Sequence, residues 1–332
     1  MVSYSLIIFC IITLLINPIL CYEPKPRVGH NSVIINNQLL VFGGWDWDSE
    51  SIEPSYYDIF DLDLSKSLYS KNWTWNSVDG GKLPVYTSFS TAILSTDDTI
   101  YLIGGYRAIN LTKGEFNYSN PVYMYNSSTE SWTALKVDNA ISRQEIKGVI
   151  NEGTIYIFGG NNATNFSAGT LYNDMQIFNV STMDWSTLSI TQNLPSPSCG
   201  YTADILTNGI IVYLGGVEIA NGSYTSRIAT FPSLKTIKLF DTVRLEWSRM
   251  NATGDDVISS RVYHSTVLKD GNIILFGGYG TDSPKLAILD TNKEIFEWKI
   301  PASSDSSPFL YGHTANLYGN YMIVTFGKQN LL

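Results

Sequence analysis

Three histidines are the side chains of this sequence best suited to metal binding or to proton transfer near neutral pH. His30 and His264 each stand 13 residues before a Gly-Gly pair, and His313 stands 14 residues before Gly327. All three therefore occupy one position of a repeated pattern. A metal or catalytic site needs different residues that converge on one point, so the spacing favours a structural role in which each imidazole bonds to a neighbouring repeat.

The remaining chemistry-bearing motifs are few. Among the cysteines, Cys10 and Cys21 lie in an N-terminal segment that we expect to be removed, so Cys199 has no partner for an intramolecular disulfide. A lone thiol either pairs with another chain or is buried as a small apolar side chain, and we favour burial. The sequence has no zinc-ligand spacing, no G-x-S-x-G elbow and no Walker loop. It therefore predicts no catalytic residue, no metal ligand and no cofactor.

The N-terminus reads as a signal peptide over residues 1–21. Leu6 to Ile16 is an apolar run of the length of a signal-peptide core, and Pro18 follows it. The run is shorter than the roughly 20 residues of a membrane-spanning helix, although a retained signal anchor is the alternative. No other transmembrane segment is expected in this chain.

Charge and sequons also indicate the secretory pathway. The chain has 21 Lys and Arg against 30 Asp and Glu, a net charge of −9, which disfavours nucleic acid and anionic lipid as partners. A secreted or cell-surface glycoprotein is predicted. Its candidate glycosylation sites are Asn72, Asn110, Asn117, Asn126, Asn162, Asn165, Asn179, Asn221 and Asn251.

A repeat organises the whole chain after the signal peptide. Five copies of an apolar run end in a double glycine, and successive copies are 61, 55, 56 and 62 residues apart. A sixth, degenerate copy reads MIVTFGK at Gly327. The pairs are Gly43 and Gly44, Gly104 and Gly105, Gly159 and Gly160, Gly215 and Gly216, and Gly277 and Gly278.

Each repeat predicts four short strands rich in Ile, Val, Tyr, Phe and Trp. One run precedes the glycines, one ends in them, a third follows a variable polar loop, and a Trp closes the unit. No helical periodicity appears, so the glycines are expected to end the second strand in a sharp turn rather than to bind phosphate. The closing residues, expected to anchor packing, are Trp75, Trp132, Trp185, Trp247 and Trp298.

These motifs resemble the kelch repeat over residues 27 to about 327. The resemblance implies an all-β, kelch-type β-propeller over residues 22–332, with about six blades of four antiparallel strands. Blades are expected to start near 27, 87, 143, 198, 261 and 311. The sixth blade is incomplete at Leu332, which suggests that the natural chain continues, and such an extension is a possible carrier of a membrane anchor.

The resemblance leaves two functional classes open. Some kelch-type propellers are copper oxidases related to galactose oxidase, whose site resembles a cluster of two Tyr, two His and a Cys cross-linked to Tyr. Here the histidines follow the repeat and Cys199 stands alone, and the S-x-D-x-G-x-T-W motif of sialidase-like propellers is absent. A non-enzymatic scaffold that binds a protein or a glycan is therefore favoured over an oxidase- or hydrolase-like enzyme.

Binding is expected on the long loops between the second and third strands. Five sequons fall in the loops of blades two to four, which leaves blades five, six and one clear. The clear sector holds an aromatic and acidic patch that we expect to bind a basic or sugar-bearing partner. The alternative is a solvated acidic loop with its Trp side chains packed between blades. The patch comprises Trp45, Asp46, Trp47, Asp48, Glu50, Glu53 and Tyr279.

Overall fold

The computed structural model describes residues 23–46, 54–66, 73–78, 82–110, 115–118, 121–138, 140–165, 168–219, 223–224, 229–255, 258–280, 284–302 and 308–329. Within these ranges the only helical element is the short 3-10 turn η1 (Pro54–Tyr57), which confirms the all-β prediction. The expected signal peptide lies outside the described residues. In the described ranges, no helix combines the length and apolar character required to cross a bilayer.

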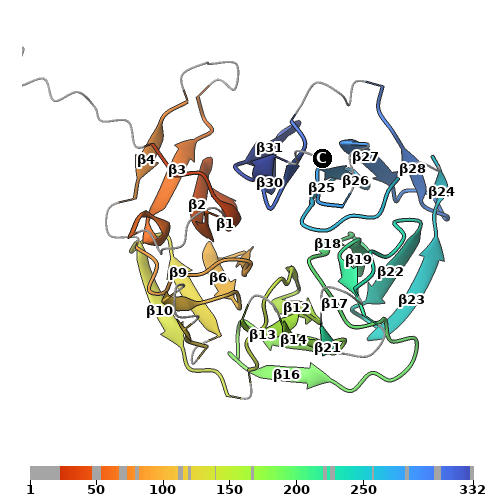
Figure 1. The fold of residues 1–332 in the computed structure, drawn as a ribbon, viewed down its shortest axis with the longest axis horizontal. Coiled ribbons are helices and arrows are strands. Elements are labelled where there is room, and N and C mark those ends of the chain that lie inside the picture. The colour runs from red at the N-terminus through yellow and green to blue at the C-terminus, as the bar shows by residue number, and fades with distance from the viewer. Residues whose placement is uncertain are drawn as a thin grey trace, which may run out of the picture.

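Five four-stranded antiparallel sheets surround a central axis like the blades of a propeller (Figure 1). The second strand of a blade is covered on both faces by neighbouring blades, so its sequence is a continuous apolar run, as in TIYLI of β6, where all five residues are buried. From the axis outwards the blades are as follows: β1 (Val28–Ile35), β2 (Gln38–Trp45), β3 (Ile59–Asp63) and β4 (Trp75–Ser77); β5 (Thr91–Leu94), β6 (Thr99–Ile103), β9 (Val122–Asn126) and β10 (Ser131–Leu135); β11 (Gly148–Asn151), β12 (Thr154–Phe158), β15 (Met175–Asn179) and β16 (Trp185–Leu188); β18 (Thr202–Ile205), β19 (Ile210–Leu214), β22 (Thr236–Asp241) and β23 (Glu246–Asn251); β25 (Ser265–Lys269), β26 (Asn272–Phe276), β27 (Leu286–Asp290) and β28 (Glu297–Lys299), with β24 (Thr253–Gly254) added in parallel to β28.

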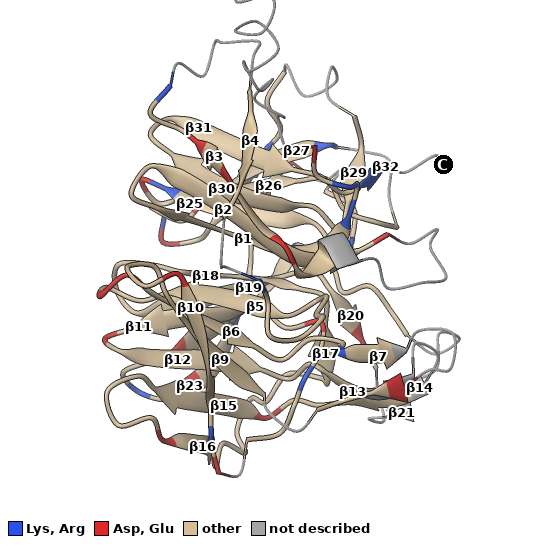
Figure 2. Ribbon diagram, turned by 90° about the vertical axis from the view of Figure 1, so that its left-hand side faces the viewer, with Lys and Arg blue, Asp and Glu red and all other residues tan. Residues whose placement is uncertain are grey.

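Short strands in the connections gather on one side of the propeller, which we call the loop face (Figure 2). Most belong to the links between the second and third strands of a blade, and β14 pairs with β21 across two such links. The short strands are β7 (Ala108–Asn110), β8 (Glu115–Phe116), β13 (Asn161–Asn165), β14 (Ala168–Leu171), β17 (Ser198–Cys199), β20 (Val217–Glu218), β21 (Ser223–Tyr224), β29 (Leu310–Tyr311) and β32 (Lys328–Gln329).

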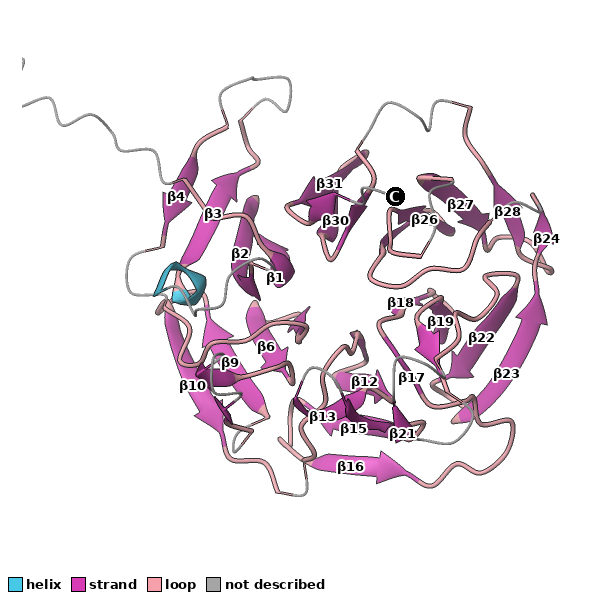
Figure 3. Cartoon of the chain, in the orientation of Figure 1, coloured by secondary structure: helices cyan, strands magenta, loops and turns pink. Residues whose placement is uncertain are grey.

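The expectation of about six four-stranded blades is corrected to five. The described residues after the fifth blade form two two-stranded sheets: one of β30 (Thr314–Tyr318) and β31 (Tyr321–Thr325), and the short pair of β29 and β32. The sheet of β30 and β31 lies between the first and fifth blades, with β30 packed against both β1 and β25 (Figure 3). Among the described residues, no further strand pairs with β30 or β31.

The double glycines join each sheet to the next. The second glycine of every pair donates its N–H to a carbonyl in the segment that leads into the following sheet, at 2.8 to 2.9 Å, and Gly327 closes the circle by donating to Arg27 at 3.0 Å. We call these contacts the glycine circle. Its donor–acceptor pairs are Gly44–Thr87, Gly105–Arg143, Gly160–Ser198, Gly216–Arg261, Gly278–Leu310 and Gly327–Arg27.

Glycine is required at these positions by conformation and by space. Gly104 and Gly105 have φ values of 70° and 90°. A Cβ on Gly104 would meet the Arg143 carbonyl oxygen at 2.1 Å, and one on Gly105 would meet Thr87 Oγ1 at 2.4 Å. A side chain would therefore break the contact between adjacent blades.

The repeated tryptophans lie at the seams between sheets. The Trp132 ring lies 5.7 Å from Phe42 of the first blade, and Trp247 lies 4.6 Å from Phe158 of the third. Trp298 is buried and donates its indole N–H to the Leu234 carbonyl at 2.9 Å. At the closing seam Trp75 lies 5.7 Å from Phe326, beside β31. Each aromatic ring therefore contributes to packing between two sheets.

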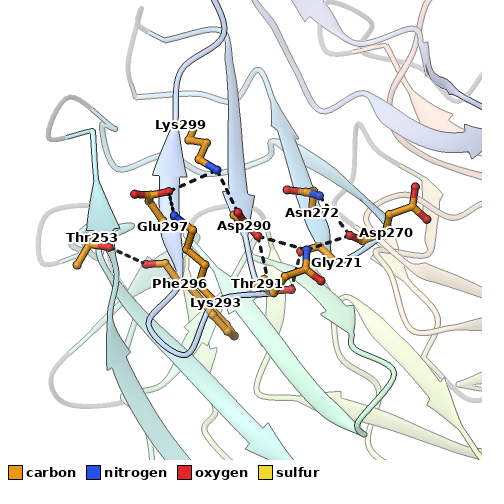
Figure 4. Close-up of polar contacts among 11 residues, drawn as sticks. Thr253, Asp270, Gly271, Asn272, Asp290, Thr291, Lys293, Phe296, Glu297 and Lys299 are labelled. Carbon is orange, nitrogen blue, oxygen red and sulfur yellow. Dashed lines mark hydrogen bonds and ion pairs between the residues drawn. The ribbon is translucent and has the colours of Figure 1, made fainter.

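An Asn or Asp ends the third strand of each blade and forms the turn into the fourth. Its Oδ1 accepts the backbone N–H two residues later in every copy, as in an Asx turn. In blade five Asp290 also lies 3.0 Å from Lys299 Nζ across the hairpin (Figure 4). The turn residues are Asp63, Asn126, Asn179, Asp241 and Asp290.

Candidate binding site at the axial mouth

A second circle of backbone hydrogen bonds surrounds the axis at the start of the innermost strands. Six residues, one from each sheet, donate their N–H to the carbonyl of the preceding member at 2.7 to 3.2 Å, and the last bond closes from Gly29 to Gly312. We call these residues the axial ring. They are Gly29, Phe89, Glu145, Gly200, Tyr263 and Gly312, and their φ values run from 52° to 65°.

Three members of the axial ring carry side chains in this left-handed backbone conformation. For an L-residue the conformation costs roughly 1–2 kcal/mol, and glycine adopts it freely. Phe89, Glu145 and Tyr263 therefore stand where the other three sheets use glycine. Strain of this kind concentrates at functional sites, which makes the three side chains the first candidates for a role in binding.

Glu145 is the centre of a polar cluster at this mouth. Tyr106 donates its hydroxyl to Oε1 at 2.8 Å, and Tyr263 donates its hydroxyl to Oε2 at 2.9 Å. The Cys199 thiol donates to Oε2 at 3.1 Å, and Asn161 Nδ2 donates to the Tyr106 oxygen at 3.2 Å. Donors from three other blades thus orient a single carboxylate.

Burial and the neighbouring carboxylate keep these donors protonated. Burial raises the pKa of Cys199 well above its usual range, and the charge of Glu145 raises it further. The same two causes, in the same order, raise the pKa of the Tyr106 hydroxyl. The Cys199 thiol is buried and reduced, and its position makes it a hydrogen-bond donor rather than a thiolate nucleophile.

Aromatic rings flank the carboxylate. The Phe89 ring lies 5.2 Å from that of Tyr263 and 6.3 Å from that of Tyr106. Aromatic faces beside a carboxylate suit an organic cation, because both the ring quadrupole and the anion attract positive charge.

A small cavity of about 150 Å³ follows the axis beneath the axial ring and is lined by the innermost strands. Lys147 and Asp204 line it, and Thr266 donates its hydroxyl to Asp204 at 2.7 Å. Burial raises the pKa of Asp204 to about 6 despite the Thr266 hydrogen bond and the Lys147 charge.

Two histidines bond to the adjacent sheet, as their repeat position predicts. His30 Nε2 lies 2.8 Å from Thr314 Oγ1, and His264 Nε2 lies 3.2 Å from Thr202 Oγ1. The ring of His313 packs edge-on against Phe276 at 5.3 Å. Burial lowers the pKa of all three imidazoles, that of His313 to about 4. Among the described residues no three His, Cys, Asp or Glu side chains form a group able to hold a metal ion.

The aromatic and acidic patch is only partly described. Trp45 is half-buried and packs against Tyr56, Tyr86 and Ala108, as the packing alternative expects. Tyr279 is 45% exposed and lies 5.4 Å from Tyr311. The two aromatic side chains thus belong to different clusters. Asp46 is half-buried, and Trp47, Asp48, Glu50 and Glu53 lie outside the described residues.

The candidate glycosylation sites have different structural contexts. Asn126 and Asn179 form the Asx turns of blades two and three, where the fold itself selects Asn or Asp. Asn117 and Asn251 are exposed, and Asn162 Nδ2 donates to the Tyr172 hydroxyl at 3.3 Å. Asn72 and Asn221 lie outside the described residues, as do the side chains of Asn110 and Asn165.

The residues at the axial mouth were not singled out from the sequence, although a signal was present. Tyr106 directly follows its double glycine, at the same repeat position as Trp45 and Tyr279. Glu145 occupies the repeat position of Gly29 and Gly200. A charged residue at a position that otherwise needs glycine is the signal that aligning the repeats would have found.

The sheets and their circular closure define the protein as a β-propeller. The chain belongs to the Kelch-repeat family, because the family model described as the KLHDC2/KLHL20/DRC7 Kelch-repeats domain matches residues 6–216. The resemblance found in the repeated motifs is thereby confirmed. Kelch propellers generally bind proteins.

Relatives and solved structures agree with this assignment. Acyl-CoA-binding domain-containing protein 4 of Arabidopsis thaliana is 24% identical over 93% of this chain and 44% of its own length. Kelch domain-containing protein 10 of Homo sapiens is 25% identical over 87% of this chain and 63% of its own length. The chain thus spans about half to two thirds of these relatives. The solved structure of YjhT superposes with a TM-score of 0.68 at 15% identity, covering 92% of each chain, and shows the same fold.

Proposed function

We propose that this protein is a non-enzymatic scaffold that binds a protein partner on its loop face. The observation that carries the proposal is the axial mouth, where donors from three blades orient the Glu145 carboxylate among aromatic rings on a strained backbone. The two circles of backbone hydrogen bonds make the scaffold rigid, so the side chains are organised before the partner arrives.

The proposed location is outside the cell or on its surface. The apolar N-terminal run followed by Pro18 and the nine sequons support it. Glycans on the sequons in the links of blades two to four would cover that part of the loop face and leave the sector around Tyr279 accessible.

We further propose that β30 and β31 are the inner half of a sixth blade. The glycine circle and the axial ring each close through six members, and β30 and β31 belong to the segment that supplies the sixth. The residues from 22 to 332 would then form one domain.

A sugar-bearing partner is the second candidate, carried by the exposed aromatic ring of Tyr279 on the loop face. The acidic residues Asp46 and Asp48 would instead favour a basic protein. Replacing Asp46 and Asp48 with Asn distinguishes the two kinds of partner. A glycan would keep its affinity, whereas a basic protein would lose part of its affinity.

Affinity capture tests the proposed function. Glycosylated protein from a secreting eukaryotic host is immobilised, and partners from culture medium and cell surfaces are quantified by mass spectrometry. Tyr279→Arg on the loop face should remove the captured partner. Val243→Arg, at an 80% exposed position in the β22–β23 turn on the opposite face, is the matched control. Equal capture by both variants would contradict the loop-face proposal.

The enzymatic alternative is tested with the same protein. An oxidase- or hydrolase-like activity should convert a substrate that is captured from the medium, and the rate should fall in a Glu145→Gln variant. Capture of an unchanged partner with no product supports the binding function, whereas turnover would overturn it.

A further inference from the structure

The Glu145 carboxylate places one negative charge at the axial mouth, and its hydrogen bonds fix its orientation. The three groups that donate to Glu145 are neutral, since two are tyrosine hydroxyls and one is a thiol. None of the ion pairs among the described residues involves Glu145. An ionised carboxylate offers about four lone-pair sites, so three donors orient this group and leave room for another.

The aromatic rings complete the recognition chemistry. Phe89 and Tyr263 lie in the axial ring on opposite sides of Glu145 and Gly200, and their rings are 5.2 Å apart. A cation within about 6 Å of an aromatic centroid is attracted to the ring face, most strongly where water is displaced. A carboxylate beside such rings therefore discriminates a cation from a neutral group of the same shape.

The size of the site limits what enters it. The cavity beneath the axial ring has about 150 Å³, which suits the tip of a side chain better than a whole cofactor. Deeper in the cavity, Lys147 and Asp204 carry opposite charges, so a second cation is not attracted there. The ligand should thus present one positive group and stay outside with the rest of its mass.

On these grounds, and resting on the proposed function, we propose that the axial mouth binds the guanidinium or ammonium group of an Arg or Lys side chain of the protein partner. The cation lies against the Glu145 carboxylate and the ring of Phe89. The strain of the three non-glycine members of the axial ring is maintained because it directs their side chains to this group.

The experiment measures binding of peptides by the complete protein. Capped seven-residue peptides in a Gly-Ser background carry Arg, Lys, Gln or Glu at the centre and are displayed at equal density. Peptides with Arg or Lys should bind more strongly than the Gln peptide, and the Glu peptide should bind least. Raising the salt concentration from 50 to 500 mM, roughly a threefold shorter screening length, should weaken binding of the two cationic peptides only.

Substitutions of Glu145 and Phe89 test whether these residues cause the preference for Arg and Lys peptides. Glu145→Gln keeps the shape and one of the two acceptor oxygens but removes the charge, and it should weaken binding of the Arg and Lys peptides about tenfold. Phe89→Leu should weaken them by about threefold. The matched control is Glu152→Gln, because Glu152 also has a positive φ but lies exposed in the β11–β12 turn, away from the mouth. Its affinity should be unchanged.

The outcomes separate the two proposals. Loss of partner capture in Tyr279→Arg without any preference for Arg or Lys peptides would overturn the cation site and leave the loop-face function intact. If free arginine amide binds as tightly as the Arg peptide, the cation need not belong to a protein side chain, and the ligand would instead be a small organic cation. If the Glu145→Gln variant unfolds at the same temperature as the wild type and still prefers Arg and Lys peptides, Glu145 is not part of the cation site.

Discussion

The seams between blades require glycine for two reasons: the backbone has a positive φ, and a Cβ would clash with the neighbouring blade. Gly104 has a positive φ and faces the Arg143 carbonyl of the next blade, whereas Gly319, in the β30–β31 turn, has φ 58° and no neighbour within 4 Å of an added Cβ. The two positions share the conformational cost of a side chain and differ in the steric one.

We therefore expect Gly104→Ala to destabilise the fold by about 3 kcal/mol or more, because the blades must separate to admit the methyl group. Gly319→Ala should cost only about 1 kcal/mol. Urea unfolding followed by tryptophan fluorescence measures both. Equal losses would show that the contact with Arg143 does not determine the need for glycine.

The buried histidines make stability depend on pH. Burial lowers the pKa of His313 to about 4, below the usual value of 6.5 for an unfolded chain. The unfolded state therefore binds the proton first, and stability is lost as the pH falls from about 6.5 towards 4. Asp204, with a raised pKa of about 6, acts in the opposite direction over the same range, but His30 and His264 add to the loss.

At pH 5 His313 should contribute about 2 kcal/mol of destabilisation relative to pH 7.5. A His313→Gln variant does not titrate, so its stability should fall less between these pH values than that of the wild type. Chemical unfolding at the two pH values measures the difference. An identical pH dependence in the variant would exclude His313 as a titrating group.

Among the elements, the hairpin between the third and fourth strands is the one most clearly determined by its local sequence. Asp241 accepts the backbone N–H groups of Val243 and Arg244 at 2.8 and 2.9 Å. The strand ends and the turn begins where a short side-chain acceptor satisfies these donors. In three repeats the sequence has this Asn or Asp six residues before the Trp that closes the repeat.

Asp241→Ala should destabilise blade four by about 1 kcal/mol, because the two N–H groups lose their acceptor. Asp241→Asn retains the acceptor oxygen and should stay close to the wild type. Thermal unfolding of both variants, with Asn as the control, tests the turn. If Asp241→Asn loses as much stability as Asp241→Ala, the effect comes from the charge of Asp241, which lies 3.8 Å from Arg244 Nε, rather than from the hydrogen bonds.

At the scale of the whole molecule, one seam differs from the others because the described chain does not run across it from β31 to β1. The last described segment returns to the first blade through Gly327 and Arg27, and Thr314 bonds to His30 and Ser32. The same type of His–Thr contact joins β18 and β25 through Thr202 and His264, where the chain itself also links the blades. The two seams form a natural comparison.

Thr314→Val should open the closing seam and raise hydrogen exchange in the peptides of β1 and β30, because separation there is opposed only by non-covalent contacts. Thr202→Val removes the matching contact inside the ring and should change exchange much less. Mass spectrometry of exchange under native conditions measures both. A greater effect of Thr202→Val would show that closure does not depend on this seam.

The amino-acid sequence by itself determined the strand pattern, the repeat and therefore the propeller class, because strand propensity, one double glycine and one tryptophan recur in each of the five full repeats. Its estimate of about six blades was wrong, since the sixth repeat pairs its strands only in two-stranded sheets among the described residues. Only the tertiary structure decided the axial mouth. Glu145 lies 39, 54 and 118 residues from Tyr106, Cys199 and Tyr263, and closure of the ring is what brings them together.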